Sequence, residues 1–160
     1  MKNFLIFRSA KHPVVKECID KINKEYKDCI IWLCIQEQCK DIYSTYDNVK
    51  FIVFPNGMFN YKRTVNDKNI INQLNQRKYD EVYIPYSTHI PRCEEIEKIV
   101  VKILRKKKAI YYGLEGRMEK KRVYIGKISP KKIINNICKA VDYNIMKIIY
   151  VFFARRRRND

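Results

Sequence analysis

Apolar residues recur along the first 113 residues in a pattern that alternates between strand and helix. Five short runs are almost wholly apolar, as expected of strands buried on both faces of a parallel sheet. They occupy residues 4–8, 29–35, 50–54, 81–86 and 109–113. The alternation predicts an α/β fold: a single Rossmann-like, doubly wound layer of about five parallel strands.

The predicted helices fall between these runs, where apolar residues return at three- and four-residue spacing. The first helix has its apolar face at Val14, Val15, Cys18, Ile19 and Ile22. Further helices are expected over residues 38–46 and 94–106, and a fourth follows Asn66 or Asp67, either of which can cap it. Residues 58–63 are expected to form a loop.

The pattern changes after Gly113. A basic connection over residues 115–127 has room for a short strand at 123–125, and Pro130 then opens one or two helices. We therefore divide the chain into a Rossmann-like domain, residues 1–127, and a basic amphipathic helical segment, residues 128–160, which we expect to belong to the same unit.

The net charge of +17 is unevenly distributed. Residues 1–100 carry 16 Lys and Arg against 13 Asp and Glu, a net of +3, whereas residues 101–160 carry 18 against 4, a net of +14. This concentration indicates contact with a polyanion, either lipid headgroups or nucleic acid. Nucleic acid is the less favoured partner, because the densest basic run, residues 105–108, sits at a helix C-terminus that favours cations anyway.

Cysteine and histidine usage narrows the chemistry. The six cysteines form no C-x-x-C pair, and Met1 leads directly into a strand-like run, so reduced cysteines in a cytoplasmic protein are expected. The two histidines have no metal-type spacing, and we expect no metal site. We expect no cofactor either, because neither a G-x-G-x-x-G fingerprint nor a P-loop follows the first strand.

Ligands of open parallel sheets gather at the carboxyl ends of the strands, so the residues there are candidates. Arg8, Ser9, Lys11 and His12 follow the first strand and could bind an anion at a helix N-terminus. Ser87 and His89 follow the fourth strand. Either histidine could act as a general acid or base. The alternative is that these residues are solvated loop, with Ser9 as a helix cap.

Several sequence features resemble the N-terminal half of GT-B glycosyltransferases, above all the heptosyltransferase-type family. The chain opens with a strand leading into Arg8-x-x-x-x-Pro13, carries Lys78-Tyr79-Asp80 before the fourth strand, and has a basic run into residues 110–113. The resemblance covers about residues 1–125. Two features differ: Lys11-His12 replaces the Gly-Asp that the family has after its first strand, and no second Rossmann half follows.

The resemblance implies an acceptor-side module in cell-surface polysaccharide or glycolipid synthesis. Such a module would be a glycosyltransferase only together with a donor-binding subunit or in an oligomer, and could equally be inactive. Its acceptor would be phosphate-bearing or lipid-linked. Arg8, Ser9, Lys11 and Ser87 would hold the acceptor, and His12 or His89 would be the base.

The C-terminal segment offers a membrane-binding helix. Residues 141–154 are apolar except at Asp142, Asn144 and Lys147. Fourteen helical residues reach about 21 Å, short of the roughly 30 Å hydrocarbon core, so the helix would lie in the interface on anionic lipid. The expected contacts are Lys147, Phe152, Phe153, Arg155, Arg156, Arg157 and Arg158. The alternative is a helix packed on the sheet or on a partner.

These features together predict a cytoplasmic protein held peripherally on the inner face of the cell membrane. The favoured function is a GT-B-like acceptor-side module. The alternative is a non-catalytic membrane-surface or protein-interaction module that uses the Rossmann layer as a scaffold.

Overall fold

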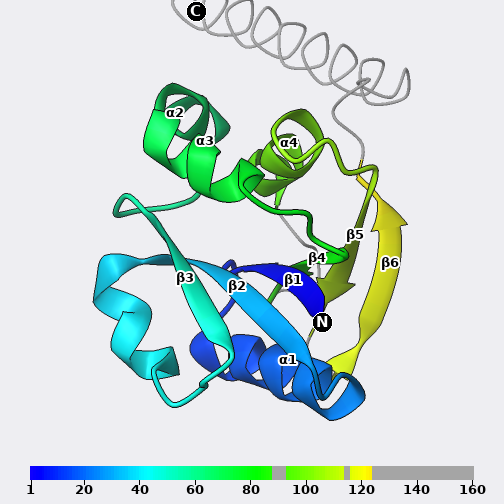
Figure 1. Cartoon of the computed structure of the whole chain (residues 1–160). Coiled ribbons are helices and arrows are strands. Elements are labelled where there is room, and N and C mark those ends of the chain that lie inside the picture. The colour runs from blue at the N-terminus through cyan, green and yellow to red at the C-terminus, as the bar shows by residue number, and fades with distance from the viewer. Residues whose placement is uncertain (88–92, 114–115, 124–160) are drawn as a thin grey trace, which may run out of the picture. The chain divides into compact units, whose positions relative to one another are not determined.

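The fold was analysed in a computed structural model, which describes residues 1–87, 93–113 and 116–123. Five strands are parallel: β1 (Lys2–Phe7), β2 (Cys29–Gln36), β3 (Val49–Phe54), β4 (Glu81–Pro85) and β5 (Lys108–Tyr112). A sixth, β6 (Met118–Arg122), pairs antiparallel with β5. The predicted α/β architecture with a mostly parallel sheet is therefore confirmed (Figure 1).

The strands are ordered β3-β2-β1-β4-β5-β6 across the sheet. The chain moves outward from β1 through β2 to β3, and then crosses back to place β4 on the other side of β1. This order, with helices on both faces, is compatible with a Rossmann-like fold. The reversal occurs at β1, which pairs with β2 through Lys2↔Cys29 to Phe7↔Cys34 and with β4 through Phe4↔Glu81 to Ile6↔Tyr83.

Helices cover both faces of the sheet and explain why its strands are apolar throughout. Helix α1 (His12–Glu25) and the short 3-10 helix η1 (Glu37–Tyr43) pack with Phe4 and Ile6 on one face. On the other face, α2 (Tyr61–Asn66), α3 (Lys68–Asn75) and α4 (Glu94–Lys102) pack with Leu5 and Phe7 (Figure 1). Successive strand residues point to opposite faces, so both sets must be apolar.

Two predicted elements have a different secondary structure from the one expected. The helix expected over residues 38–46 is the 3-10 helix η1. The loop expected over residues 58–63 ends at Asn60, because α2 begins at Tyr61. Asn60 starts α2, because its side-chain carbonyl accepts a hydrogen bond from the Arg63 N–H at 2.9 Å. The structure adds a strand, β6, that ends at Arg122, whereas the strand expected over residues 123–125 lies outside the described residues except for Val123.

Helix α4 ends four residues before the predicted boundary at residue 106. Its last helical residue is Lys102, and Arg105 adopts a left-handed φ of 53°. The N–H of Lys106 then bonds the carbonyl of Val100 at 3.0 Å. A left-handed residue cannot continue a right-handed helix, so the chain turns here toward β5.

No helix within the described residues is long and apolar enough to cross a membrane. The predicted helical segment, residues 128–160, lies outside the described residues, and so do its seven predicted membrane contacts.

The cap of α3 gives a test of this local structure. Asp67 Oδ1 accepts a hydrogen bond from the Ile70 N–H at 3.1 Å. Replacing Asp67 by alanine should lower the free energy of unfolding by about 1 kcal/mol, because an N–H of the first turn loses its partner. Asp67→Asn retains an acceptor and should cost much less. Urea denaturation should give a lower midpoint for Asp67→Ala at unchanged slope, and equal midpoints for the two variants would contradict the cap.

Candidate functional site

A pocket of about 590 Å³ lies at the carboxyl ends of the first three strands. Its walls come from Arg8 after β1, Gln36 at the end of β2, residues 57–59 after β3, and residues 93–96 at the start of α4. These segments flank the strand ends because the connection from β1 enters α1 on one face of the sheet and the connection from β3 enters α2 on the other. Crevices outside the carboxyl ends of the strands are the usual ligand sites of open α/β sheets.

The side chain of Gln36 organises one wall of the pocket. It is only 2% exposed, and its Oε1 accepts hydrogen bonds from Nε of Arg8, at 3.0 Å, and from Nη2 of Arg8. Its Nε2 donates to the carbonyl oxygen of Gly57 at 2.9 Å. Because a buried amide must use its donors and acceptors within the protein, Gln36 fixes both the Arg8 guanidinium and the loop after β3.

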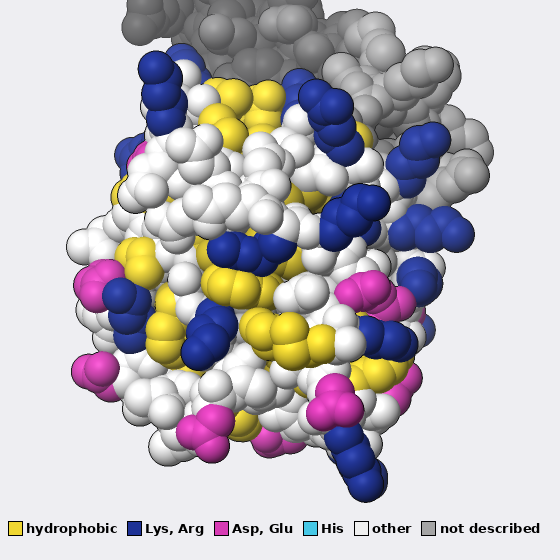
Figure 2. Space-filling model, in the orientation of Figure 1, with side chains coloured by type: hydrophobic (Ala, Val, Ile, Leu, Met, Phe, Trp, Pro, Cys, Tyr) yellow, Lys and Arg dark blue, Asp and Glu magenta, His cyan; other side chains and the backbone are white. Residues whose placement is uncertain are grey.

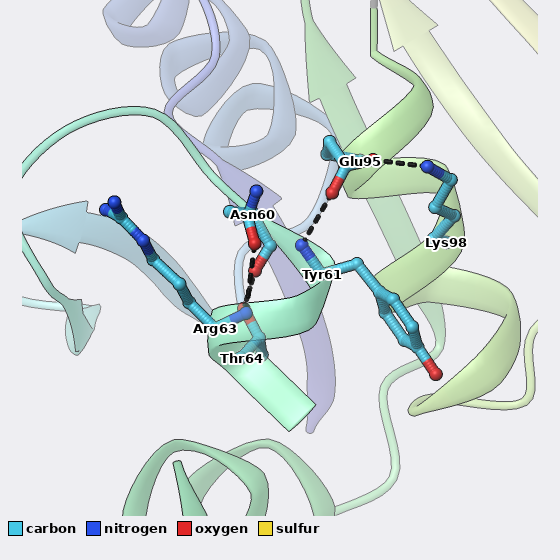
Figure 3. A network of polar contacts seen from close by, with 6 residues as sticks. All are labelled: Asn60, Tyr61, Arg63, Thr64, Glu95 and Lys98. Carbon is cyan, nitrogen blue, oxygen red and sulfur yellow. Dashed lines mark hydrogen bonds and ion pairs between the residues drawn. The ribbon is translucent and has the colours of Figure 1, made fainter. Parts of the chain in front are cut away.

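The loop after β3 is also held at its far end. Oε2 of Glu95 accepts a hydrogen bond from the Tyr61 N–H at 2.8 Å, and Oε1 of Glu95 pairs with Lys98 (Figure 3). The hydrogen bond from Lys98, with that from Tyr61, lowers the pKa of Glu95. Gly57 has a φ of 102°, a conformation that favours glycine. The loop is therefore tethered to β2 by Gln36 and to α4 by Glu95.

The two serines predicted as ligand-binding residues form hydrogen bonds between the segments that follow β1 and β4. Oγ of Ser9 lies 2.6 Å from the Pro85 carbonyl oxygen and 3.1 Å from that of Phe7, so its hydroxyl links the ends of β1 and β4. Oγ of Ser87 accepts a hydrogen bond from the Lys11 N–H at 2.9 Å. Ser9 also lines the pocket, whereas Ser87 and Lys11 are not among its lining residues.

His12 is the first residue of α1, which covers the opposite face of the sheet from α4. Its Nδ1 is 2.9 Å from the hydroxyl oxygen of Tyr43, a fully buried residue of the α1 face. Burial, together with the charges of Arg8 and Lys16, lowers the pKa of His12. The neutral ring can then accept a hydrogen bond from the Tyr43 hydroxyl at Nδ1. His12 does not line the pocket, and His89 lies outside the described residues, so the catalytic roles of both stay predictions.

The cysteine thiols of the described residues are poorly suited to nucleophilic chemistry. Five cysteines there are free thiols, and burial raises the pKa of Cys93, which lines the pocket, to about 11. A thiol with that pKa is a poor nucleophile at neutral pH. Within residues 1–87, 93–113 and 116–123, no three His, Cys, Asp or Glu side chains are grouped as metal ligands.

Sequence reasoning identified Arg8 and Ser9 but missed Gln36, Phe59 and Glu95. A polar residue at the end of the apolar second strand was the available signal for Gln36. The Gly-Met-Phe sequence after the Pro-Asn turn was the signal for the loop. Glu95 gave none, because a glutamate in the first turn of a helix is ordinary.

Titration of His12 tests this arrangement. We expect its NMR-detected pKa to lie below 6.5, because burial and the neighbouring Arg8 and Lys16 disfavour the imidazolium. As the pH falls, the unfolded chain therefore binds this proton at a higher pH than the folded chain does. His12 therefore contributes stability that is complete above pH 6.5 and is lost as the pH falls toward the folded-state pKa.

His89→Gln is the control for that titration. The NMR signal that disappears in this variant belongs to His89, and the one that remains belongs to His12. Lys16→Gln should raise the His12 pKa, since it removes one of the two cations. A His12 pKa at or above 6.5 in the folded protein would contradict the described environment.

Comparison of the chain with family models, with curated protein sequences and with solved structures finds no significant match. The resemblance to the GT-B N-terminal half therefore remains a prediction, and the function has to be argued from the geometry of the pocket.

Proposed function

We propose that the pocket beside Arg8 binds a saccharide acceptor that carries an anionic group, and that the chain acts as a GT-B-like acceptor-side module. The observation that carries the proposal is the guanidinium of Arg8, which the buried Gln36 holds at the edge of a pocket of about 590 Å³. A pocket of that volume falls in the range typical of small-molecule sites.

The lining of the pocket matches the groups of a charged sugar. Sugar hydroxyls both donate and accept hydrogen bonds, and the Arg8 guanidinium and the Glu95 carboxylate supply a donor and an acceptor in the lining. Phe59 and Met58 offer apolar surface for the C–H faces of a ring. Arg8 retains Nη1, which makes no hydrogen bond to Gln36, for a phosphate or carboxylate, the groups that guanidinium binds best.

The sequence around β1 favours an acceptor over a nucleotide. The turn from β1 into α1 reads Arg-Ser-Ala-Lys-His-Pro and has none of the glycines that let a pyrophosphate approach the backbone. A nucleotide-sugar donor would then be held by a separate subunit, and the anionic membrane would carry a lipid-linked acceptor.

A second candidate is a non-catalytic saccharide-binding or scaffolding module. Two features of the pocket favour it. Glu95 is kept ionised by Lys98 and the Tyr61 N–H, which makes its carboxylate a weak base, and the Cys93 thiol is protonated at neutral pH. The described lining of the pocket thus favours binding over acid–base chemistry.

Ligand binding by the full chain tests the proposal. Saturation-transfer NMR should detect glucose 1-phosphate more strongly than glucose, because the phosphate engages Arg8. Arg8→Ala should weaken binding about 10- to 100-fold, the usual effect of losing a charged hydrogen bond. Gln36→Leu should weaken it as well, since Arg8 is then no longer held.

Lys16→Ala is the matched control, because it removes a nearby cation that does not line the pocket. It should leave binding within about twofold. Circular dichroism checks that each variant is folded. Equal signals from glucose and glucose 1-phosphate would contradict the role of Arg8, and calorimetric binding of UDP-glucose without hydrolysis would contradict the acceptor-side assignment.

A further inference from the structure

The basic run over residues 105–108 lies beyond the helix that precedes it. Helix α4 ends at Lys102, and the left-handed Arg105 turns the chain away from the helix. The run continues through a short connection into β5, whose first residue is Lys108. A helix dipole acts only near the last turn, so it does not account for lysines at this place.

The run borders a groove of about 300 Å³ at the amino ends of β4 and β5. This is the opposite edge of the sheet from the pocket beside Arg8. Lys and Arg side chains gather along the β6 side of the molecule, at the right of the view (Figure 2). Three lining residues, Val82, Ala109 and Ile110, are apolar and at most 6% exposed. We call this site the lysine groove, after its four lysines: Lys106, Lys107, Lys108 and Lys120.

Two of the four ammonium groups are held by the protein. Nζ of Lys106 donates a hydrogen bond to the Tyr79 carbonyl oxygen at 2.5 Å. Lys120 comes from β6, and its Nζ lies 2.8 Å from Oε1 of Glu81. The side chains of the other two, Lys107 and Lys108, are exposed and form no hydrogen bond or ion pair with residues 1–87, 93–113 or 116–123. They are therefore available to a ligand.

The two acidic residues of the groove are already engaged. Oδ2 of Asp80 accepts a hydrogen bond from the Asn3 N–H at 2.7 Å. Glu81 pairs with Lys120 through Oε1 and accepts a hydrogen bond from the Tyr83 hydroxyl through Oε2, at 3.0 Å. Four lysines against two carboxylates leave the lining with an excess of two positive charges. The groove is therefore suited to an anion.

We infer that the lysine groove binds a linear oligophosphate, an anion in which several phosphate groups are linked in a chain. Lysine binds phosphate as a point charge, whereas the planar fork of arginine is the better match for a carboxylate. The volume of the groove is at the lower end of small-molecule sites, which leaves room for more than one phosphate group. The buried apolar residues beside the lysines lower the local dielectric constant and strengthen the attraction.

Nucleic acid fits the groove less well. Proteins that bind single strands combine a basic groove with aromatic side chains on which the bases stack. Among the described residues that line the lysine groove, none is aromatic. The lining therefore favours recognition of the phosphate groups alone. The groove shares no lining residue with the pocket beside Arg8, so the inference does not rest on the proposed function.

An NMR titration of the full chain tests the inference. Tripolyphosphate, added without metal ions, should shift the backbone amide signals of Lys107, Lys108 and Lys120 to saturation. These signals report on the groove and not on the basic segment over residues 128–160. Orthophosphate should bind roughly tenfold more weakly, because it carries fewer charges. Tighter binding of tripolyphosphate than of ATP would identify the free chain as the ligand, and the reverse order a nucleotide; either result supports the site.

Two variants should change the affinity in opposite directions. Lys107→Gln/Lys108→Gln should weaken tripolyphosphate binding about tenfold, because two ammonium–phosphate contacts are lost. Glu81→Gln should strengthen it about threefold, because it removes a carboxylate from the lining and releases Lys120 from its ion pair. A variant that failed to fold could not bind more tightly.

Lys62→Gln/Lys68→Gln is the matched control, because it removes two exposed lysines of α2 and α3 that do not line the groove. It should change the affinity less than about twofold. Equal losses in the two lysine double variants would indicate diffuse attraction to a basic chain and would overturn the inference. So would saturable binding of poly-U RNA at these lysines without binding of tripolyphosphate.

The groove and the pocket are tested separately. Arg8→Ala should leave tripolyphosphate binding at the groove within about twofold, because Arg8 does not line it. Lys107→Gln/Lys108→Gln should likewise leave glucose 1-phosphate binding at the pocket unchanged. Failure of either assay leaves the other conclusion intact.

Discussion

Burial of β1 on both faces is the constraint on which the rest of the structure depends. Residues 4–7 are 0% exposed, with Phe4 and Ile6 facing α1 and Leu5 and Phe7 facing α2, α3 and α4. Strands β2 and β4 occupy both edges of β1. No polar side chain can be accommodated between Phe4 and Phe7, and the next one, Arg8, therefore emerges at the edge of the sheet where the pocket lies.

The buried amide of Gln36 converts this position into a site. A guanidinium at a strand end would otherwise be free to move in solvent, and the loop after β3 would be attached only through its own ends. Gln36 bonds both groups at once, and its burial makes an unpaired alternative costly. One side chain thereby couples the orientation of Arg8 to the position of Gly57.

The charge of the described chain is less one-sided than its composition indicates. Strand β6 places Arg117 and Lys121 beside Glu119, and Lys120 beside Glu81. Exposed pairs of this kind contribute little to stability, but they reduce the local positive potential.

The sequence by itself determined the strands, the first helix and part of the site. Apolar runs must be buried on both faces whatever their neighbours are, so all five parallel strands and the face of α1 could be predicted, as could a helix cap at Asn66 or Asp67 and the place of Arg8. The hydrophobic pattern is the same for any order of the strands. Only the tertiary structure therefore decided that β1 lies between β2 and β4. It also decided that Gln36, Gly57 and Glu95 line one pocket with Arg8. Those residues lie 28 to 87 positions away from Arg8 in the sequence, and no local rule of spacing or propensity connects groups that only chain crossover brings together.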